Sequence, residues 1–179
     1  LIPAMLISIA TTGFAFVRPL YVLFIETIET DLKLLPTITG ILYSIIGIFS
    51  TIAAAWWGRR VERTGIRSSL LLTASLTASM YFAHIFAENT YQLIPVCILL
   101  GFGFGAIQPL LFTSINSNVS IERKGGILGV ATSFQILGNI IGPIMAGIIA
   151  GIIGLRFSFL ISSFMFLIVA ILGYYSVKK

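Results

Sequence analysis

Four polar side chains stand inside long apolar stretches of the chain, where they are the residues best suited to recognise a bound molecule. Arg18 and Gln108 each directly precede a proline. Gln135 and Asn139 are four residues apart, so a helix places them on one face, one turn from each other. Amide groups both donate and accept hydrogen bonds, and an arginine adds a fixed positive charge. These residue types predict recognition by hydrogen bonds rather than covalent chemistry.

Chemistry that needs a buried carboxylate or an activated nucleophile has no candidates. The six acidic residues all lie between the apolar stretches or at their margins: Glu26, Glu29, Asp31, Glu62, Glu88 and Glu122. The sequence has no Gly-x-Ser-x-Gly string and no His-Glu-x-x-His string, and the single cysteine, Cys97, excludes an internal disulfide. We expect His84, near the end of the third stretch, at a membrane interface rather than in a proton relay. The sequence predicts no catalytic residue, metal site or cofactor, and argues against an intramembrane enzyme.

The elements that carry these residues are membrane-spanning helices. Of 179 residues, 58% are hydrophobic and only 9% are charged. A soluble domain carries roughly a quarter of charged residues, so the composition excludes a water-soluble enzyme and, despite a net charge of +5, a nucleic-acid-binding domain. A helix needs about 20 apolar residues to cross a bilayer. Six stretches qualify, at about 2–24, 36–57, 69–86, 91–115, 127–150 and 157–177, and predict an all-α membrane protein.

The charged residues between these stretches indicate an orientation. Eight of the 11 basic residues fall on one side: Arg59, Arg60, Arg63, Arg67, Arg123, Lys124, Lys178 and Lys179. Cytoplasmic loops of membrane proteins carry the excess of Lys and Arg, so both ends of the segment are expected in the cytoplasm, with the bundle in the cell membrane. The opposite loops have an acidic balance. The start at Leu1, directly ahead of a span, predicts a piece of a longer polypeptide.

An offset of 89 residues superposes several features of the sequence. The matching pairs are Gly40 with Gly129, Ser44 with Ser133, Gly58 with Gly147, Gly65 with Gly154, Arg67 with Arg156 and Ser69 with Ser158. The chain therefore divides into repeats at about 1–89 and 90–179, and each holds three spans, so the two copies are inverted. Inverted three-helix repeats are typical of secondary transporters. The alternative is chance similarity in a low-complexity, glycine-rich sequence.

The segment from Gly58 to Arg67 resembles the loop motif of the major facilitator superfamily, Gly-x-x-x-Asp-Arg-x-Gly-Arg-Lys. Gly58, Arg63, Gly65 and Arg67 match, and Glu62 stands in for the acid. Ile66 and Arg60 depart from the pattern. The resemblance implies a cytoplasmic gating loop, in which Gly58 allows close helix approach, Gly65 permits a tight turn, and Glu62 pairs with arginines to latch neighbouring helices. The alternative is a generic basic loop that only sets the topology.

The fifth stretch resembles the Gly-x-x-x-Gly-Pro-x-x-Gly-Gly pattern of drug–proton antiporters in that superfamily. Gly138, Gly142, Pro143 and Gly147 match, and Ala146 replaces the penultimate glycine. The first two glycines lie one turn apart and make a smooth face for another helix, and the proline can kink the helix. Close packing without any role in antiport is the alternative.

The superfamily has 12 spans in two homologous halves, so the resemblance implies that this chain is one half and that its partner is the other. First halves commonly carry an arginine four residues before the glycine cluster of the fourth span. Cys97 occupies that position here, ahead of Gly101. This substitution, the altered loop motif and the missing initiator methionine favour the C-terminal half.

The function implied is secondary active transport of a small-molecule solute by alternating access, in contact with membrane lipid. Proton-coupled efflux of drugs or lipophilic solutes comes first. A sugar or metabolite symporter and a non-transporting scaffold are the alternatives. Since no carboxylate lies deep within a span, a proton-coupling group is expected in the other half.

Overall fold

A computed structural model describes residues 2–29, 33–116 and 123–177. Among these residues there are six α-helices and one short 3-10 turn, and no strand. They are α1 (Ile2–Ile28), α2 (Leu35–Thr64), α3 (Ile66–Ala83), η1 (His84–Phe86), α4 (Thr90–Asn116), α5 (Lys124–Ile153) and α6 (Leu155–Ser176). Each of the six spans is long and apolar enough to cross a membrane. Four residues of the charge argument, Asp31, Glu122, Lys178 and Lys179, lie outside the described residues.

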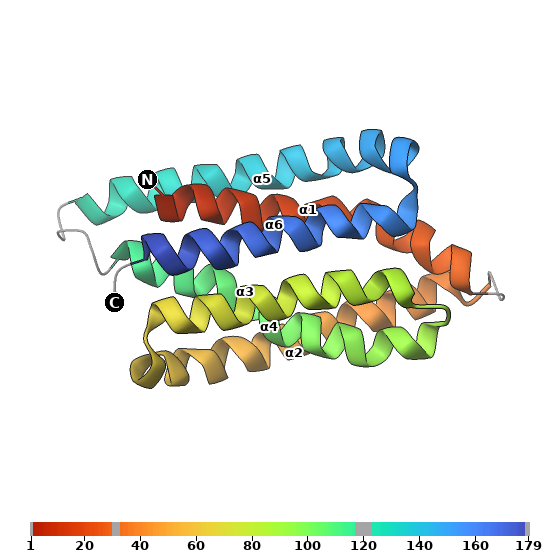
Figure 1. The fold of residues 1–179 in the computed structure, drawn as a ribbon, viewed down its shortest axis with the longest axis horizontal. Coiled ribbons are helices and arrows are strands. Elements are labelled where there is room, and N and C mark those ends of the chain that lie inside the picture. Colours follow the sequence, from red (N-terminus) through yellow and green to blue (C-terminus); the bar gives the residue numbers. More distant parts are fainter. Residues whose placement is uncertain (1, 30–32, 117–122, 178–179) are drawn as a thin grey trace.

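The six helices run lengthwise beside one another (Figure 1). The starts of α1 and α5, the ends of α4 and α6 and the α2–α3 turn lie together at the left end of the view. The ends of α1, α3 and α5 lie at the opposite end. An up-and-down bundle of six spans therefore brings the basic segments of the sequence to one end.

Helix α2 is longer than the predicted span, which ended at residue 57. It continues to Thr64, so most of the predicted gating loop is helical. Arginine and glutamate are good helix formers, and hydropathy does not register a helix that extends past the membrane. The turn itself is a single residue, Gly65, because α3 begins at Ile66.

The α2–α3 and α5–α6 turns have the same geometry. Gly65 has φ 77° and ψ 157°, and Gly154 has φ 83° and ψ 162°. This backbone region is essentially restricted to glycine. In each turn a serine four residues later donates its hydroxyl to the glycine carbonyl, Ser69 at 2.9 Å and Ser158 at 2.8 Å. The turns are 89 residues apart, at the offset found in the sequence.

Helix pairing is unchanged when the first three helices are exchanged with the last three. Helix α1 packs along α5 as α4 packs along α2, and α3 packs on α4 as α6 packs on α1. One contact illustrates the correspondence. A Cβ atom added at Gly138 would lie 3.0 Å from Thr12 N, and one added at Gly101 would lie 3.1 Å from Phe49 Cβ. At the offset of 89 residues, Thr12 corresponds to Gly101 and Phe49 corresponds to Gly138. The two contacts are therefore equivalent, but the glycine that corresponds to one residue of the pair in the first contact corresponds to the other in the second.

His84 is fully buried within the bundle, and its predicted depth near the membrane interface stays a prediction. Its ring stacks on Phe159 with centroids 5.1 Å apart and planes 8° apart. Its Nδ1 lies 2.7 Å from the Met80 carbonyl oxygen. The end of α3 tightens into η1 and carries the imidazole under α1 and α6, where aromatic rings surround it.

Candidate functional site

An amide pair joins three helices in the interior of the bundle. Gln135 on α5 donates from Nε2 to Oε1 of Gln108 on α4 at 2.9 Å. Gln108 in turn donates from Nε2 to the Thr11 hydroxyl on α1 at 3.4 Å. Thr11 donates to the Ile7 carbonyl at 2.7 Å, within its own helix. Both glutamines are half-buried, so they line a face of the bundle that a further molecule can reach.

Sequence reasoning selected both glutamines but missed Thr11. A threonine inside an apolar helix commonly bonds to its own backbone four residues earlier, and so gives no signal of its own. The signal available was its spacing from Arg18. Residues 11, 14 and 18 share one face of a helix, and that face of α1 meets α4.

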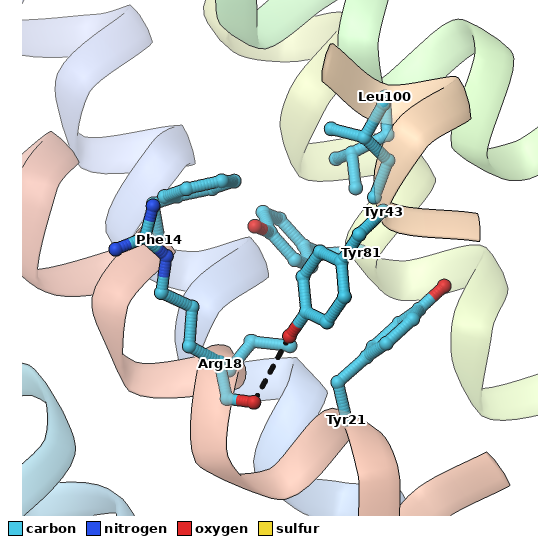
Figure 2. A pocket seen from close by; sticks show the side chains of 8 residues that line it. Phe14, Arg18, Tyr21, Tyr43, Tyr81 and Leu100 are labelled. Atoms are coloured by element: carbon cyan, nitrogen blue, oxygen red, sulfur yellow. Dashed lines mark hydrogen bonds between the residues drawn. The ribbon is translucent and has the colours of Figure 1, made fainter. Parts of the chain in front are cut away.

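Aromatic rings continue this face toward Arg18. Phe14 and Phe104 stack with ring centroids 3.9 Å apart and planes 10° apart. The Arg18 guanidinium lies over the Phe14 ring, 5.0 Å from its centroid, in a cation–π contact (Figure 2). Arg18 is exposed. We call the set Thr11, Phe14, Arg18, Phe104, Gln108 and Gln135 the polar–aromatic strip.

Three tyrosines surround a small cavity beside Arg18 (Figure 2). Tyr43 donates its hydroxyl to the Arg18 carbonyl at 2.9 Å, and the Tyr21 hydroxyl lies 2.9 Å from Cys97 Sγ. Tyr81 is buried and lines the same cavity. The cavity measures about 10 Å³, so it is too small for a solute.

Asn139 does not join the amide pair. Its Nδ2 donates to the Gln135 carbonyl oxygen at 3.2 Å, one turn back along α5, and the residue is exposed. Of the four polar residues selected from the sequence, Gln108 and Gln135 are the pair that the structure joins by a hydrogen bond between side chains. Arg18 is linked to them through Phe14 and Phe104.

The glycine motif of α5 divides into two parts. Gly138 and Gly142 are buried against α1, and a Cβ atom added at Gly142 would lie 2.8 Å from both Ala15 Cβ and Phe16 N. Gly147 is exposed, with nothing within 4 Å of an added Cβ atom, and Pro143 is exposed as well. The first two glycines therefore hold α5 close to α1, beside the strip.

The segment from Gly58 to Arg67, predicted as a gating loop, differs from its prediction in two respects. A Cβ atom added at Gly58 would meet nothing within 4 Å, so no described helix approaches it closely. Glu62 is exposed and makes no ion pair with any described residue. Instead, Arg67 lies 3.8 Å from the centroid of the Tyr174 ring on α6. Exposed ion pairs gain little free energy, whereas this arginine gains a contact with an aromatic ring.

A groove between α2 and α4 borders this segment. It has a volume of about 320 Å³, and its lining includes Trp57, Gly58, Glu62 and Thr113. The Trp57 Nε1 group is buried and has no hydrogen-bond partner among the described residues. The groove thus combines an open glycine, an unused donor and a carboxylate.

Comparison of the sequence with known proteins identifies its family. Residues 4–179 match the Major Facilitator Superfamily, which is almost the whole chain. The chain belongs to the major facilitator superfamily. Its six membrane-length helices fit one half of a major facilitator fold, as the sequence predicted.

Several bacterial proteins resemble the chain. It is 32% identical over 169 residues to multidrug resistance protein MdtG of Proteus mirabilis, covering 93% of this chain and 42% of the relative. It is 25% identical over 178 residues to the proteins of the same name from Erwinia billingiae and Klebsiella pneumoniae, covering 99% of this chain. These alignments cover 43% and 42% of the two relatives. The chain thus spans less than half the length of these major facilitator relatives.

Proposed function

We propose that the chain is one half of a secondary transporter that exports lipophilic solutes by alternating access. The observation that carries the proposal is the polar–aromatic strip, which spans α1, α4 and α5. The resemblance to proteins named for multidrug resistance supports the same solute class.

The chemistry of the strip fits a mainly apolar solute with few polar groups. The stacked and half-buried Phe14 and Phe104 rings offer an apolar aromatic surface to an aromatic solute. Beyond them, Gln108 and Gln135 are half-buried, and Gln135 Oε1 accepts no hydrogen bond from a described residue. It is therefore free to accept one from a solute.

A second candidate function is a symporter for a sugar or a metabolite. The specific observation in its favour is Arg18, whose guanidinium is exposed on the strip and would pair with an anionic group. Its contact with Phe14 favours the first candidate, because part of its charge already faces an aromatic ring. A non-transporting scaffold would have no use for the half-buried amides of the strip.

The missing partner in this account is a second six-helix half. The curated relatives are more than twice as long as the alignment, which leaves room for it. We propose that one of its helices packs against the groove beside Gly58, where it would reach the exposed Glu62. The latch expected at this segment would then form between halves. The assignment of this chain to the C-terminal half remains part of the proposal.

The positions of the acidic and basic residues support a proposal for the proton coupling and for the orientation in the membrane. The acidic residues all lie outside the predicted span cores, so we assign the proton-binding group to the other half. We propose that both ends of the segment lie in the cytoplasm and the protein in the cell membrane, because basic segments remain on the cytoplasmic side. Units of about 1–89 and 90–179 act as inverted repeats that move around the strip.

Protection of an introduced cysteine tests the strip as the solute site. In the intact protein without Cys97, the variant Gln135→Cys should react with a membrane-permeant maleimide, and a lipophilic cationic dye should slow that reaction. A sugar should not. Ser79→Cys on the exposed side of α3 is the control and should react equally with or without the dye. Protection by the sugar alone would favour the symporter, and equal reaction at position 135 under all conditions would contradict both.

A further inference from the structure

The inner end of α2 carries three arginines and a tryptophan that together surround an open pocket. The pocket has a volume of about 320 Å³ and is lined by Trp56, Arg59, Arg60 and Arg63. All four residues are exposed. We call this set the α2 arginine cluster.

The length of α2 places the cluster at the membrane surface. The helix has 30 residues, about 45 Å at 1.5 Å per residue, whereas the hydrocarbon core of a bilayer is about 30 Å thick. Trp56 lies about 32 Å along the helix from its start, at the depth where tryptophan is enriched in membrane proteins. The three arginines follow within two turns, so they lie among the lipid headgroups.

The aromatic residues fix one side of the pocket. The Arg60 guanidinium lies 4.9 Å from the centroid of the Trp56 ring and 6.0 Å from that of Trp57. Trp56 in turn packs against Phe102 of α4, with centroids 5.3 Å apart. Arg60 is thus held in place on a packed aromatic surface, and its position does not depend on a charged partner.

No described acid neutralises the cluster. The nearest acid in the sequence, Glu62, lines the groove between α2 and α4 and makes no ion pair with a described residue. None of the three arginines makes an ion pair with a described residue, so their guanidinium donors are available. Guanidinium groups bind phosphate through two parallel hydrogen bonds.

We propose that the α2 arginine cluster is a binding site for the headgroup phosphate of an anionic phospholipid. Arg59 and Arg63 lie one helical turn apart, so both can hold the phosphate. Arg60 supplies the third positive charge. The acyl chains extend along α2, where Ile48 and Ile52 are exposed. The site depends on the membrane position of α2 and not on the transported solute, so it stands or falls separately from the proposed function.

Native mass spectrometry of the intact protein in detergent, titrated with phosphatidylglycerol, tests the proposal. The double variant R59Q/R63Q removes two charges, each worth about 1 kcal/mol near an anionic surface. It should therefore weaken binding about thirtyfold. R59K/R63K keeps the charges and loses only the forked geometry, so it should weaken binding much less. Phosphatidylcholine should not bind at this site.

The matched control is R67Q/R123Q, which removes the same charge from the same end of the bundle outside the pocket. It should leave phosphatidylglycerol binding within about twofold of the unaltered protein. Equal weakening by both glutamine variants would overturn the proposal, because it would show attraction to the basic face as a whole. Displacement of the lipid by an equal concentration of inorganic phosphate would also overturn it, since the site would then be one for the free anion.

Discussion

The half-buried Gln108–Gln135 pair shows how polar side chains can be kept in an apolar bundle at small cost. Each amide finds a partner on another helix, at 2.9 Å between the glutamines and 3.4 Å to Thr11. Interhelical hydrogen bonds in membranes contribute only about 0.6 kcal/mol on average. The pair is therefore a weak source of stability, which is compatible with the proposed role in solute recognition.

Replacement of Gln135 by leucine separates recognition from stability. The variant should insert and unfold much like the unaltered protein, since one interhelical bond is worth about 0.6 kcal/mol. Its efflux of a lipophilic dye should fall about fivefold, because a solute loses a hydrogen bond of about 1 kcal/mol. The measurement is dye efflux from vesicles at equal protein content.

Ser79→Ala is the control for this variant. Ser79 is exposed on α3 and donates to the Ser75 carbonyl of its own helix, so its loss should leave efflux unchanged. Equal efflux by the Gln135 and Ser79 variants would remove the amide pair from the solute site.

At the scale of helices, glycines determine which faces come together. Gly138 and Gly142 bring α5 against α1, and Gly101 and Gly105 bring α4 against α2, close to Ile46 and Ser50. Small residues permit close backbone approach, and packing rather than a hydrophobic driving force joins helices in lipid. Of these two contacts, the one made by Gly138 and Gly142 holds α5 close to α1, beside the strip.

Gly142→Ala and Gly147→Ala are a matched pair within one motif. The first adds a methyl group 2.8 Å from Ala15 Cβ and Phe16 N, whereas the second adds it in open space. We expect Gly142→Ala to lower the free energy of unfolding by about 1–3 kcal/mol, as overpacking does. Gly147→Ala should be neutral or slightly stabilising. Thermal unfolding of the solubilised protein measures both, and equal shifts would contradict the packing role.

The two glycine turns give a prediction about symmetry. Gly65 and Gly154 have nearly the same φ and ψ, in a region that costs other residues about 1–3 kcal/mol. Gly65→Ala and Gly154→Ala should therefore destabilise the bundle by similar amounts. Gly126→Ala, inside α5 with nothing within 4 Å of its added Cβ atom, should not. A large effect at only one turn would argue against equivalent three-helix units.

The whole molecule was more predictable from the sequence than the site. Six continuous apolar runs give six spans, because crossing a bilayer leaves the backbone no other simple solution. The extension of α2 to Thr64 was missed, since hydropathy ends where the membrane ends. The contacts of Arg67 with Tyr174 and of His84 with Phe159 join residues far apart in the chain. Such pairs depend on how the helices pack, and periodicity within one helix does not reveal them.

The orientation of the whole molecule can be tested by labelling single cysteines from outside the cell. In the intact protein without Cys97, cysteines at Lys33 and Arg156 should react with an impermeant thiol reagent. Cysteines at Arg60 and Lys124 should react only after the membrane is opened, because basic segments remain in the cytoplasm. The reverse pattern would overturn the orientation and, with it, the inner-leaflet position of the α2 arginine cluster.

The central claim is that this bundle forms half of a solute transporter driven by a proton gradient. Its most direct test is dye movement into proteoliposomes that contain the intact protein, with an imposed pH gradient. We predict accumulation of a lipophilic dye that stops when the gradient is dissipated and falls about fivefold with Gln135→Leu. Correctly inserted protein that moves no dye under any gradient, or moves it equally with the gradient dissipated, would contradict the account.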